Sequence, residues 1–184
     1  LSYLFSFLSL VLLRLAVLEK DSDKKILRRG FRDGWNYTFG HPPIRQLLQL
    51  LALMSLSAMP YTVLLPVLAV RYFGGGAPLL GTLMAMAGAG SLCGALILAF
   101  RRSIVGLERW VGAAALLAAL SLLGLSAGVS VEAAGVLLFA LGVGLLLLIV
   151  GVNTLLQHMV PDHLRGRVMS FYNMSFLGLV PVGC

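Results

Sequence analysis

The sequence has few charged residues for its length. Of its 184 residues, 11% are charged, whereas a soluble globular chain carries roughly 25%. Hydrophobic residues make up 59%, and the mean hydropathy is +0.97. The apolar residues form runs of about 20, long enough to cross a hydrocarbon layer of about 30 Å, and they lack the apolar/polar alternation of membrane strands. This pattern excludes a soluble domain and predicts an all-α, polytopic transmembrane helical bundle.

Groups suited to catalysis or metal binding are also scarce. The only cysteines are Cys93, inside an apolar run, and Cys184, the last residue. Their spacing fits neither a disulfide framework nor a metal site. The histidines His41, His158 and His163 have no nucleophile or metal partner at a suitable spacing. The sequence therefore argues against an enzyme, and we expect neither a cofactor nor a bound metal.

The charges that are present have a positive bias and lie in the connections between apolar runs. The net charge is +7. Basic loops are the usual topology signal of membrane proteins, and they favour anionic lipid head groups. We therefore expect a lipid bilayer with anionic head groups as a partner, and no nucleic acid.

Six apolar segments are predicted along the chain. The first, 1–18, and the last, which begins near Val168, reach the two ends of the sequence. We therefore expect a piece of a longer protein, cut inside a membrane segment at both ends. The four segments between them are 44–70, 79–100, 110–128 and 133–156.

The distribution of lysine and arginine orients these segments. Loops 19–46, 101–109 and 157–167 hold seven, three and two of them, whereas loops 71–78 and 128–132 hold one and none. Lysine and arginine accumulate in cytoplasmic loops. The bias of twelve to one therefore places the first three loops in the cytoplasm.

The longest connection leaves two interpretations open. Its apolar residues recur at helical spacing, which predicts a short amphipathic helix on the membrane surface. Gly30 and Gly34 weaken that helix, so a solvated linker is the alternative. The residues at helical spacing are Ile26, Leu27, Phe31 and Trp35.

Proline and glycine mark two of the segments. Pro60 and Pro66 predict that the second segment is kinked or broken near its middle, because a proline leaves a backbone carbonyl without its helical partner. With polar residues such as Tyr61 nearby, this segment is typical of a moving, cavity-lining helix; kinked packing is the alternative. In the third segment, Gly90 and Gly94 form a GxxxG pair that predicts close helix contact.

Two motifs carry a family resemblance. The connection between the fifth and sixth segments reads PDHLRGR at 161–167. It resembles the cytoplasmic loop between helices ten and eleven of major facilitator superfamily transporters, where a Pro-x-x-x-Arg-Gly-Arg turn is typical. The run MPYTVLLPV at 59–67 is similar to helix seven of the drug- and siderophore-exporter branch, which includes enterobactin exporters and macrolide efflux proteins. GWNY at 34–37 and NTLLQ at 153–157 fit the same branch.

The resemblance implies the domain organisation. Residues 1–18 would end helix six of the N-terminal bundle, 19–46 would form the cytoplasmic central loop, and 47–184 would form helices seven to eleven of the C-terminal bundle. The partner of this bundle would be the N-terminal half of the same chain, in a bacterial cytoplasmic membrane. One departure is GALILAFRR at 94–102, which lacks the aspartate of the family's Gly-x-x-x-Asp-Arg-x-Gly-Arg motif. A second charge-relay gate is not implied there.

The resemblance also implies transport by alternating access, in which two bundles rock about a central site. Arg165 and Arg167 would pair with carboxylates or helix C-termini on the cytoplasmic face, and with Asp162 and Gly166 they would form a gate or hinge. We expect Asp162 to cap the helix that follows it. The alternative is that the arginines only anchor the topology.

The substrate class follows from the residues that would line a cavity. They are mostly neutral or apolar, which suits an amphipathic drug or siderophore: Ser57, Pro60, Tyr61, Pro66, Met86, Asn153 and Asn173. Segments two to five hold no carboxylate at membrane depth, so a proton antiporter would need its coupling carboxylate upstream of Leu1. A nutrient importer, a non-transporting scaffold and a channel subunit remain as alternatives, because one fold hosts several functions.

Overall fold

The computed structural model describes residues 35, 37–58, 60–101 and 103–178. The predicted first segment, 1–18, and residues 19–34 of the predicted central loop, with most of the predicted surface helix, lie outside the described residues. The part that is described contains helices and no strand, so the prediction of an all-α, polytopic fold is confirmed. The elements are α3 (Pro42–Ala58), α4 (Tyr61–Val67), the π-helix η1 (Leu68–Tyr72), α5 (Ala77–Ala99), α6 (Leu107–Ser126), α7 (Val131–Met159) and α8 (Asp162–Leu177).

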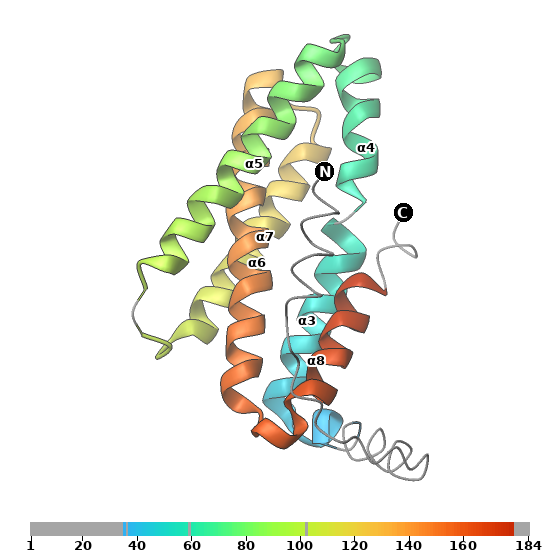
Figure 1. Ribbon diagram of the computed structural model, residues 1–184. Helices are drawn as coiled ribbons and strands as arrows, with labels where there is room; N and C mark the ends of the chain where they lie inside the picture. Colours follow the sequence, from blue (N-terminus) through green and yellow to red (C-terminus); the bar gives the residue numbers. More distant parts are fainter. Residues whose placement is uncertain (1–34, 36, 59, 102, 179–184) are drawn as a thin grey trace, which may run out of the picture.

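The helices run up and down in one elongated bundle (Figure 1). The stretch from α3 through η1 and the helices α5, α6 and α7 are each long and apolar enough to cross a membrane. α5 and α6 both pack on α7, whereas α3 packs chiefly on α8. One end of the bundle, called the basic end here, carries Arg45, Arg101, Arg109, Arg165 and Arg167. The opposite end, called the far end, is formed by the connections 73–76 and 127–130.

The contact between α5 and α7 is made by backbone against backbone. A Cβ atom added to Gly142 of α7 would lie 2.2 Å from the Ala87 carbonyl oxygen. One added to Gly90 of α5 would lie 2.0 Å from the Phe139 carbonyl oxygen. Neither glycine therefore tolerates a side chain, and the close contact predicted from the GxxxG pair is confirmed.

The other face of α7 meets α6 in the same way. A Cβ atom at Gly144 would lie 2.8 Å from the Ala114 carbonyl oxygen, and one at Gly151 would lie 2.7 Å from Val111 Cγ2. Half of the most apolar window of α7 is buried, against 22% in α5 and 22% in α6. α7 is therefore the centre of a three-helix slab, named here the α5–α6–α7 slab.

The pair formed by α3 and α8 is held by side chains. The buried Ser55 hydroxyl donates a hydrogen bond to the Phe176 carbonyl oxygen at 2.6 Å. The Tyr172 hydroxyl of α8 donates to the Ile149 carbonyl oxygen of α7 at 3.2 Å. The buried residues of α3 share one helix face, because they follow its period of three to four residues: Ile44, Leu48, Leu51, Met54, Ser55 and Ala58.

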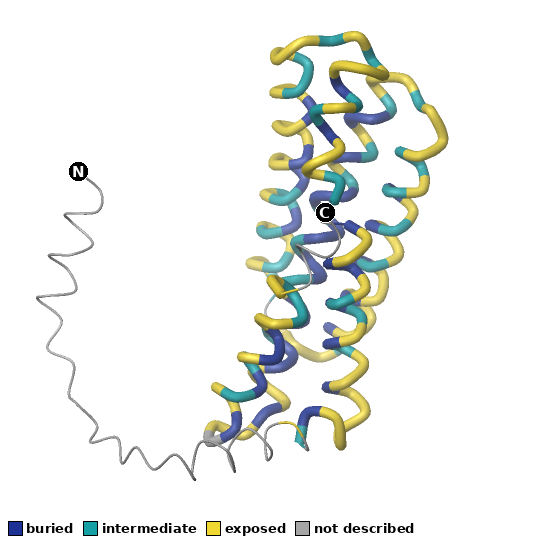
Figure 2. The backbone as a smooth tube through the Cα atoms, turned by 90° about the vertical axis from the view of Figure 1, so that its right-hand side faces the viewer, coloured by how far each residue is buried: buried dark blue, intermediate teal, exposed yellow. Residues whose placement is uncertain are grey.

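The outward faces of the helices are exposed along much of the bundle (Figure 2). On α6, Leu116, Leu120 and Leu123 are each more than 60% exposed and share one face by their spacing. A soluble protein does not present such a stripe to water. Here it is the surface expected against lipid tails.

The last helix begins earlier than the sequence predicted. α8 starts at Asp162, not near Val168. Pro161 is extended, with ψ of 148°, and its carbonyl oxygen accepts from the backbone N–H groups of Leu164 and Arg165 at 3.0 Å. Proline suits a helix entry because its own nitrogen has no hydrogen to donate. The charged residues that we expected in a turn therefore form the first helical turns of α8.

Candidate functional site

The second membrane segment is broken where its prolines stand. α3 ends at Ala58 and α4 begins at Tyr61, with Pro60 between them, so the predicted break is confirmed. Pro66 lies inside α4, and the chain then continues as the π-helix η1, in which the Phe73 N–H donates to the Leu68 carbonyl oxygen at 3.0 Å. A π-turn spreads its hydrogen bonds over five residues and often accompanies functional sites.

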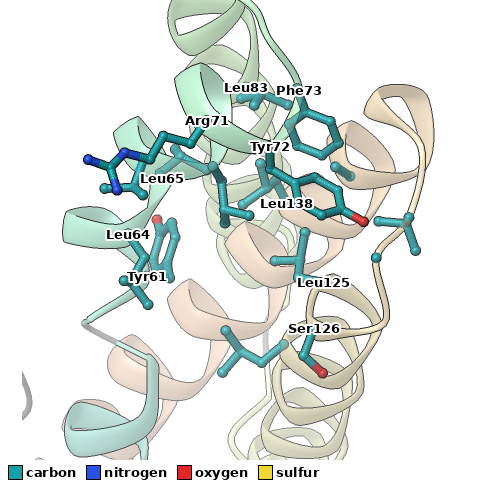
Figure 3. Close-up of a pocket in the computed structure, with 16 residues that line it drawn as sticks. Tyr61, Leu64, Leu65, Arg71, Tyr72, Phe73, Leu83, Leu125, Ser126 and Leu138 are labelled. Atoms are coloured by element: carbon teal, nitrogen blue, oxygen red, sulfur yellow. The ribbon is translucent and has the colours of Figure 1, made fainter.

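A cavity of about 550 Å³ lies beside this broken helix, towards the far end (Figure 3). Its walls come from α4, η1, α5, α6, α7 and the α6–α7 connection. Its volume is within the roughly 300–1,000 Å³ of small-molecule sites. Most of the lining is apolar, with leucine the commonest residue: Leu64, Leu65, Leu68, Leu83, Leu122, Leu125 and Leu138.

The polar groups of this cavity are few. Tyr61, Arg71, Tyr72 and Ser126 contribute them. The Ser126 hydroxyl already donates to the Leu123 carbonyl oxygen at 2.7 Å, so it is satisfied within α6. The two tyrosine hydroxyls and the Arg71 guanidinium are therefore the groups that could orient a ligand.

Tyr72 spans the outer edge of the cavity. A Cβ atom at Gly128 would lie 2.7 Å from the Tyr72 hydroxyl oxygen, so the phenol of η1 reaches the α6–α7 connection (Figure 3). Gly128 has φ of +72°, a conformation that favours glycine. The absence of a side chain at 128 both permits the turn and leaves room for this phenol.

Tyr61 is the predicted substrate-cavity residue that the structure places in the 550 Å³ cavity. It also lines a smaller cavity of about 210 Å³ between α4 and α5, with Thr62 of α4 and Ser91 of α5. The Ser91 hydroxyl lies 3.1 Å from the Ala87 carbonyl oxygen and 3.4 Å from that of Gly142. Tyr61 thus borders two cavities beside the broken helix.

The other predicted cavity residues are dispersed. Ser57 is exposed on α3. Met86 is 42% exposed on α5, where its side chain lies 3.7 Å from the position of a Cβ atom at Gly135. Asn173 is exposed on α8. None of these three lines the 550 Å³ cavity.

Asn153 belongs to a polar cluster between α7 and α8. Its side-chain oxygen accepts a hydrogen bond from the Gln157 amide nitrogen one turn later. The buried Tyr172 of α8 lies beside it, and its hydroxyl donates to the Ile149 carbonyl oxygen. The cluster satisfies polar groups at a helix contact, an arrangement that holds membrane helices together.

The predicted gate residues lie at the start of α8. The Arg165 guanidinium contacts the Asp162 carboxylate at 2.6 Å, one helical turn away, and the Asp162 side chain is 88% exposed. The expectation that Asp162 caps the helix is wrong, because Pro161 occupies the N-cap and makes no side-chain hydrogen bond. At the first helical position the carboxylate instead reaches Arg165. Gly166 has open space around it, and Arg167 is half-buried.

A further cavity lies at the basic end, near these residues. It has a volume of about 420 Å³ and is bounded by α3, α6 and α7, with Gln46 and Glu108 among its lining. Met159, at the end of α7, also borders it. This hollow is the counterpart of the far-end cavity, and the α5–α6–α7 slab contributes to both.

Arg101 organises the α5–α6 connection where the family motif lacks its aspartate. Its guanidinium donates to the carbonyl oxygens of Ser103 at 2.8 Å and Val105 at 2.6 Å. It also lies 5.1 Å from the ring centre of Trp110, a cation–π contact. The arginine therefore holds its own loop together by contacts that need no acidic partner.

Sequence reasoning missed Arg71 and Tyr72 as site residues. Arg71 was used only to orient the segments, as the one basic residue of the predicted loop 71–78. Arg71 and Tyr72 of the π-helix η1, and Phe73 directly after it, all line the cavity. The sequence feature that could have pointed to these residues is Pro66, which precedes them closely and disturbs the regular helix there. In the described part of the chain no group of three or more His, Cys, Asp or Glu residues could hold a metal ion.

A family model of the major facilitator superfamily, described as transmembrane secretion effector, matches residues 1–184. The chain belongs to this family. As a transmembrane secretion effector of the major facilitator type, it is an integral membrane transporter. No curated protein and no solved structure showed a significant match to the chain.

Proposed function

We propose that this transporter exports a small amphipathic molecule, of the drug or siderophore type, by proton-driven alternating access. The observation that carries the proposal is the broken helix α3–α4–η1 beside the 550 Å³ cavity. A helix interrupted at Pro60 and Pro66 can bend, and bending beside a binding cavity is how one bundle opens or closes a site.

The cavity chemistry supports the substrate class. Leucine side chains form most of its wall, with hydroxyls at Tyr61 and Tyr72. An amphipathic molecule buries its apolar part against such a wall, whereas a sugar would leave its hydroxyls unpaired there. Within the drug- and siderophore-exporter branch, the resemblance of residues 59–67 favours an enterobactin- or macrolide-type substrate. The site of action would be the bacterial cytoplasmic membrane.

Proton coupling needs an ionisable group at membrane depth. The carboxylates Glu108 and Glu132 lie in the first turns of α6 and α7, near the ends of the bundle, and Asp162 begins α8. The coupling carboxylate is therefore proposed to lie outside 42–178. The small-molecule substrate and the N-terminal half would be the partners of this bundle in transport, and membership in a transporter family favours a non-enzymatic role.

Everted membrane vesicles test direction and coupling together. An acidic vesicle interior should drive a fluorescent macrolide or a catecholate siderophore into the vesicles, and nigericin should abolish the uptake by collapsing the pH gradient. Vesicles without the protein provide the control. Uptake that ignores the gradient would contradict proton coupling. Accumulation only in right-side-out vesicles would identify an importer, and no flux in either orientation would favour a scaffold or channel subunit.

A further inference from the structure

The far-end cavity combines an apolar wall with one positive charge. Leu65, Leu83 and Leu138 are buried in its wall, and Leu125 from α6 completes the apolar part. Arg71 is the one charged residue that lines it. A cavity with apolar walls and one cation discriminates between ligands by the charge of their head group.

We infer that this cavity binds a drug-sized amphipathic anion, whose apolar body lies against the leucines and whose carboxylate pairs with Arg71. The inference narrows the substrate class and in that respect rests on the proposed function. It concerns equilibrium binding, so it can be tested without transport.

The Arg71 guanidinium is available for a ligand. Within the described residues it forms no ion pair. Glu132, a carboxylate at the same end of the bundle, does not line the cavity. Arg71 is exposed at the edge of the apolar wall, so an incoming carboxylate can reach its guanidinium and form a charge-assisted hydrogen bond with it.

The local helix geometry places a second donor near the cation. In Figure 3 the Tyr61 hydroxyl lies on the same side of the cavity as the Arg71 guanidinium, with Leu64 beside both. Tyr61 and Arg71 are ten residues apart, nearly three turns of the continuous stretch α4–η1. Tyr61 is therefore a second hydrogen-bond donor on this side of the cavity for a polar part of the ligand.

Tyr72 limits the size of the ligand. Its phenol crosses to Gly128 and its ring packs edge-on against Phe73, with ring centres 5.2 Å apart. The remaining volume of about 550 Å³ suits one drug-sized or single-chain molecule. The structure therefore favours a free amphipathic carboxylate over a two-chain phospholipid.

The test uses two photoreactive probes that differ only in charge. A diazirine-bearing dodecanoic acid and its methyl ester are added to the intact protein in nanodiscs of zwitterionic lipid, and labelled residues are mapped by mass spectrometry. Labelling of 64–73 and 122–129 is divided by labelling of the lipid-facing stripe Leu116–Leu123, which corrects for partition into the bilayer. We expect half-maximal labelling of the cavity by the acid at about a tenfold lower concentration than by the ester, as a charge-assisted hydrogen bond implies.

Variants assign the preference to the arginine. Arg71→Gln should remove the tenfold advantage of the acid while ester labelling stays unchanged, which also shows that the cavity is folded. Arg109→Gln, an exposed cation of α6 at the basic end, should keep the advantage. If Arg71→Gln cannot be purified, Leu125→Trp should fill the cavity and lower labelling by both probes.

Three outcomes would overturn the inference. They are equal labelling by acid and ester in the natural protein, an unchanged preference in Arg71→Gln, and loss of acid labelling when phosphatidylglycerol is added to the nanodiscs. The last would assign Arg71 to a lipid head group. Anion binding without gradient-driven flux would leave this inference standing and overturn the proposed function, whereas flux without the Arg71-dependent preference would do the reverse.

Discussion

The α5–α6–α7 slab and the α3–α8 pair are two different ways of holding membrane helices together. In the slab, unbroken helices of 23, 20 and 29 residues approach so closely that glycine is required at the contacts. In the pair, α3 stops after 17 residues, and its contact with α8 includes the hydrogen bond from Ser55 to the Phe176 carbonyl oxygen. We therefore expect the slab to be stiff and the broken helix of the pair to be able to bend.

The 550 Å³ cavity lies where these two regions meet. The slab supplies Leu83, Leu125 and Leu138, and the extension of α3 through α4 and η1 supplies Tyr61 and Arg71. A movement of the broken helix against a fixed slab would change the cavity volume directly. Under the proposed alternating access, the slab would be the frame and the broken helix would be the moving part.

The largest effect is expected where the slab has no room. Gly142→Leu places a side chain at a position where even a Cβ atom lies 2.2 Å from the Ala87 carbonyl oxygen. Overpacking costs about 1–3 kcal/mol or more, and here the obstacle is backbone that cannot rotate away. We expect most of the protein to elute as aggregate in size-exclusion chromatography.

Gly88→Leu is the matched control, because a Cβ atom at Gly88 of α5 meets nothing within 4 Å. This variant should remain monodisperse with a melting temperature close to that of the natural protein. Equal behaviour of Gly142→Leu and Gly88→Leu would show that the close packing of α5 and α7 is not what holds the slab.

The next effect concerns the moving part. Pro66→Ala restores a backbone donor inside α4, and a proline inside a helix costs about 3 kcal/mol relative to alanine. We expect a helix that is more stable but bends less, so the melting temperature rises while the transport rate falls several-fold. Pro78→Ala is the control, since Pro78 stands in the first turn of α5, where proline is tolerated. A faster Pro66→Ala transporter would argue that the break limits transport.

Arg165→Ala tests the basic end, where α8 begins. Its ion pair with Asp162 is exposed and is worth at most about 1 kcal/mol, so the melting temperature should hardly change. If Arg165 belongs to a cytoplasmic gate, the transport rate should fall several-fold while membrane insertion stays normal. Arg109→Ala, at the same end on α6, should transport normally. Normal flux in Arg165→Ala would leave topology anchoring as its role.

Much of the frame was predictable from sequence. The length and apolarity of a membrane helix follow from the bilayer, so the spans α5, α6 and α7 fall within three residues of the predicted segments at each end. Pro60 predicted the break between α3 and α4, and Gly90 with Gly94 predicted the close contact of α5 with its neighbour α7. These features depend on the local sequence alone, so they can be predicted without knowing how the helices pack.

The cavity was much less predictable, because it depends on angles between helices. Met86, Ser57 and Asn173 are polar or flexible residues on plausible helices, yet helical rotation leaves them outside the 550 Å³ cavity. Arg71 and Tyr72 line it from the π-helix η1, where the sequence pattern predicted a loop at 71–78. The predicted start of α8 was wrong for a different reason. The charged residues suggested a loop, but Pro161 is the N-cap of a helix that begins at Asp162.

The smallest expected effect distinguishes side-chain hydrogen bonds from backbone contacts between helices. Ser55→Ala removes the 2.6 Å hydrogen bond between α3 and α8, and a net loss of about 1 kcal/mol in the free energy of unfolding is expected. Ser91→Ala in the slab removes a longer bond, 3.4 Å, to the Gly142 carbonyl oxygen, while the backbone contact at Gly142 remains. Its cost should therefore be smaller.

Ser57→Ala, on the exposed side of α3, corrects for the effect of serine replacement in a helix. Unfolding followed by tryptophan fluorescence in mild detergent gives the three free energies. If Ser91→Ala costs as much as Ser55→Ala, then the slab also depends on side-chain hydrogen bonds, and its stiffness cannot be ascribed to glycine contacts alone. If only Ser55→Ala is destabilised, the contact between α3 and α8 depends on a single side-chain hydrogen bond. Such a contact would separate more easily than the slab during transport.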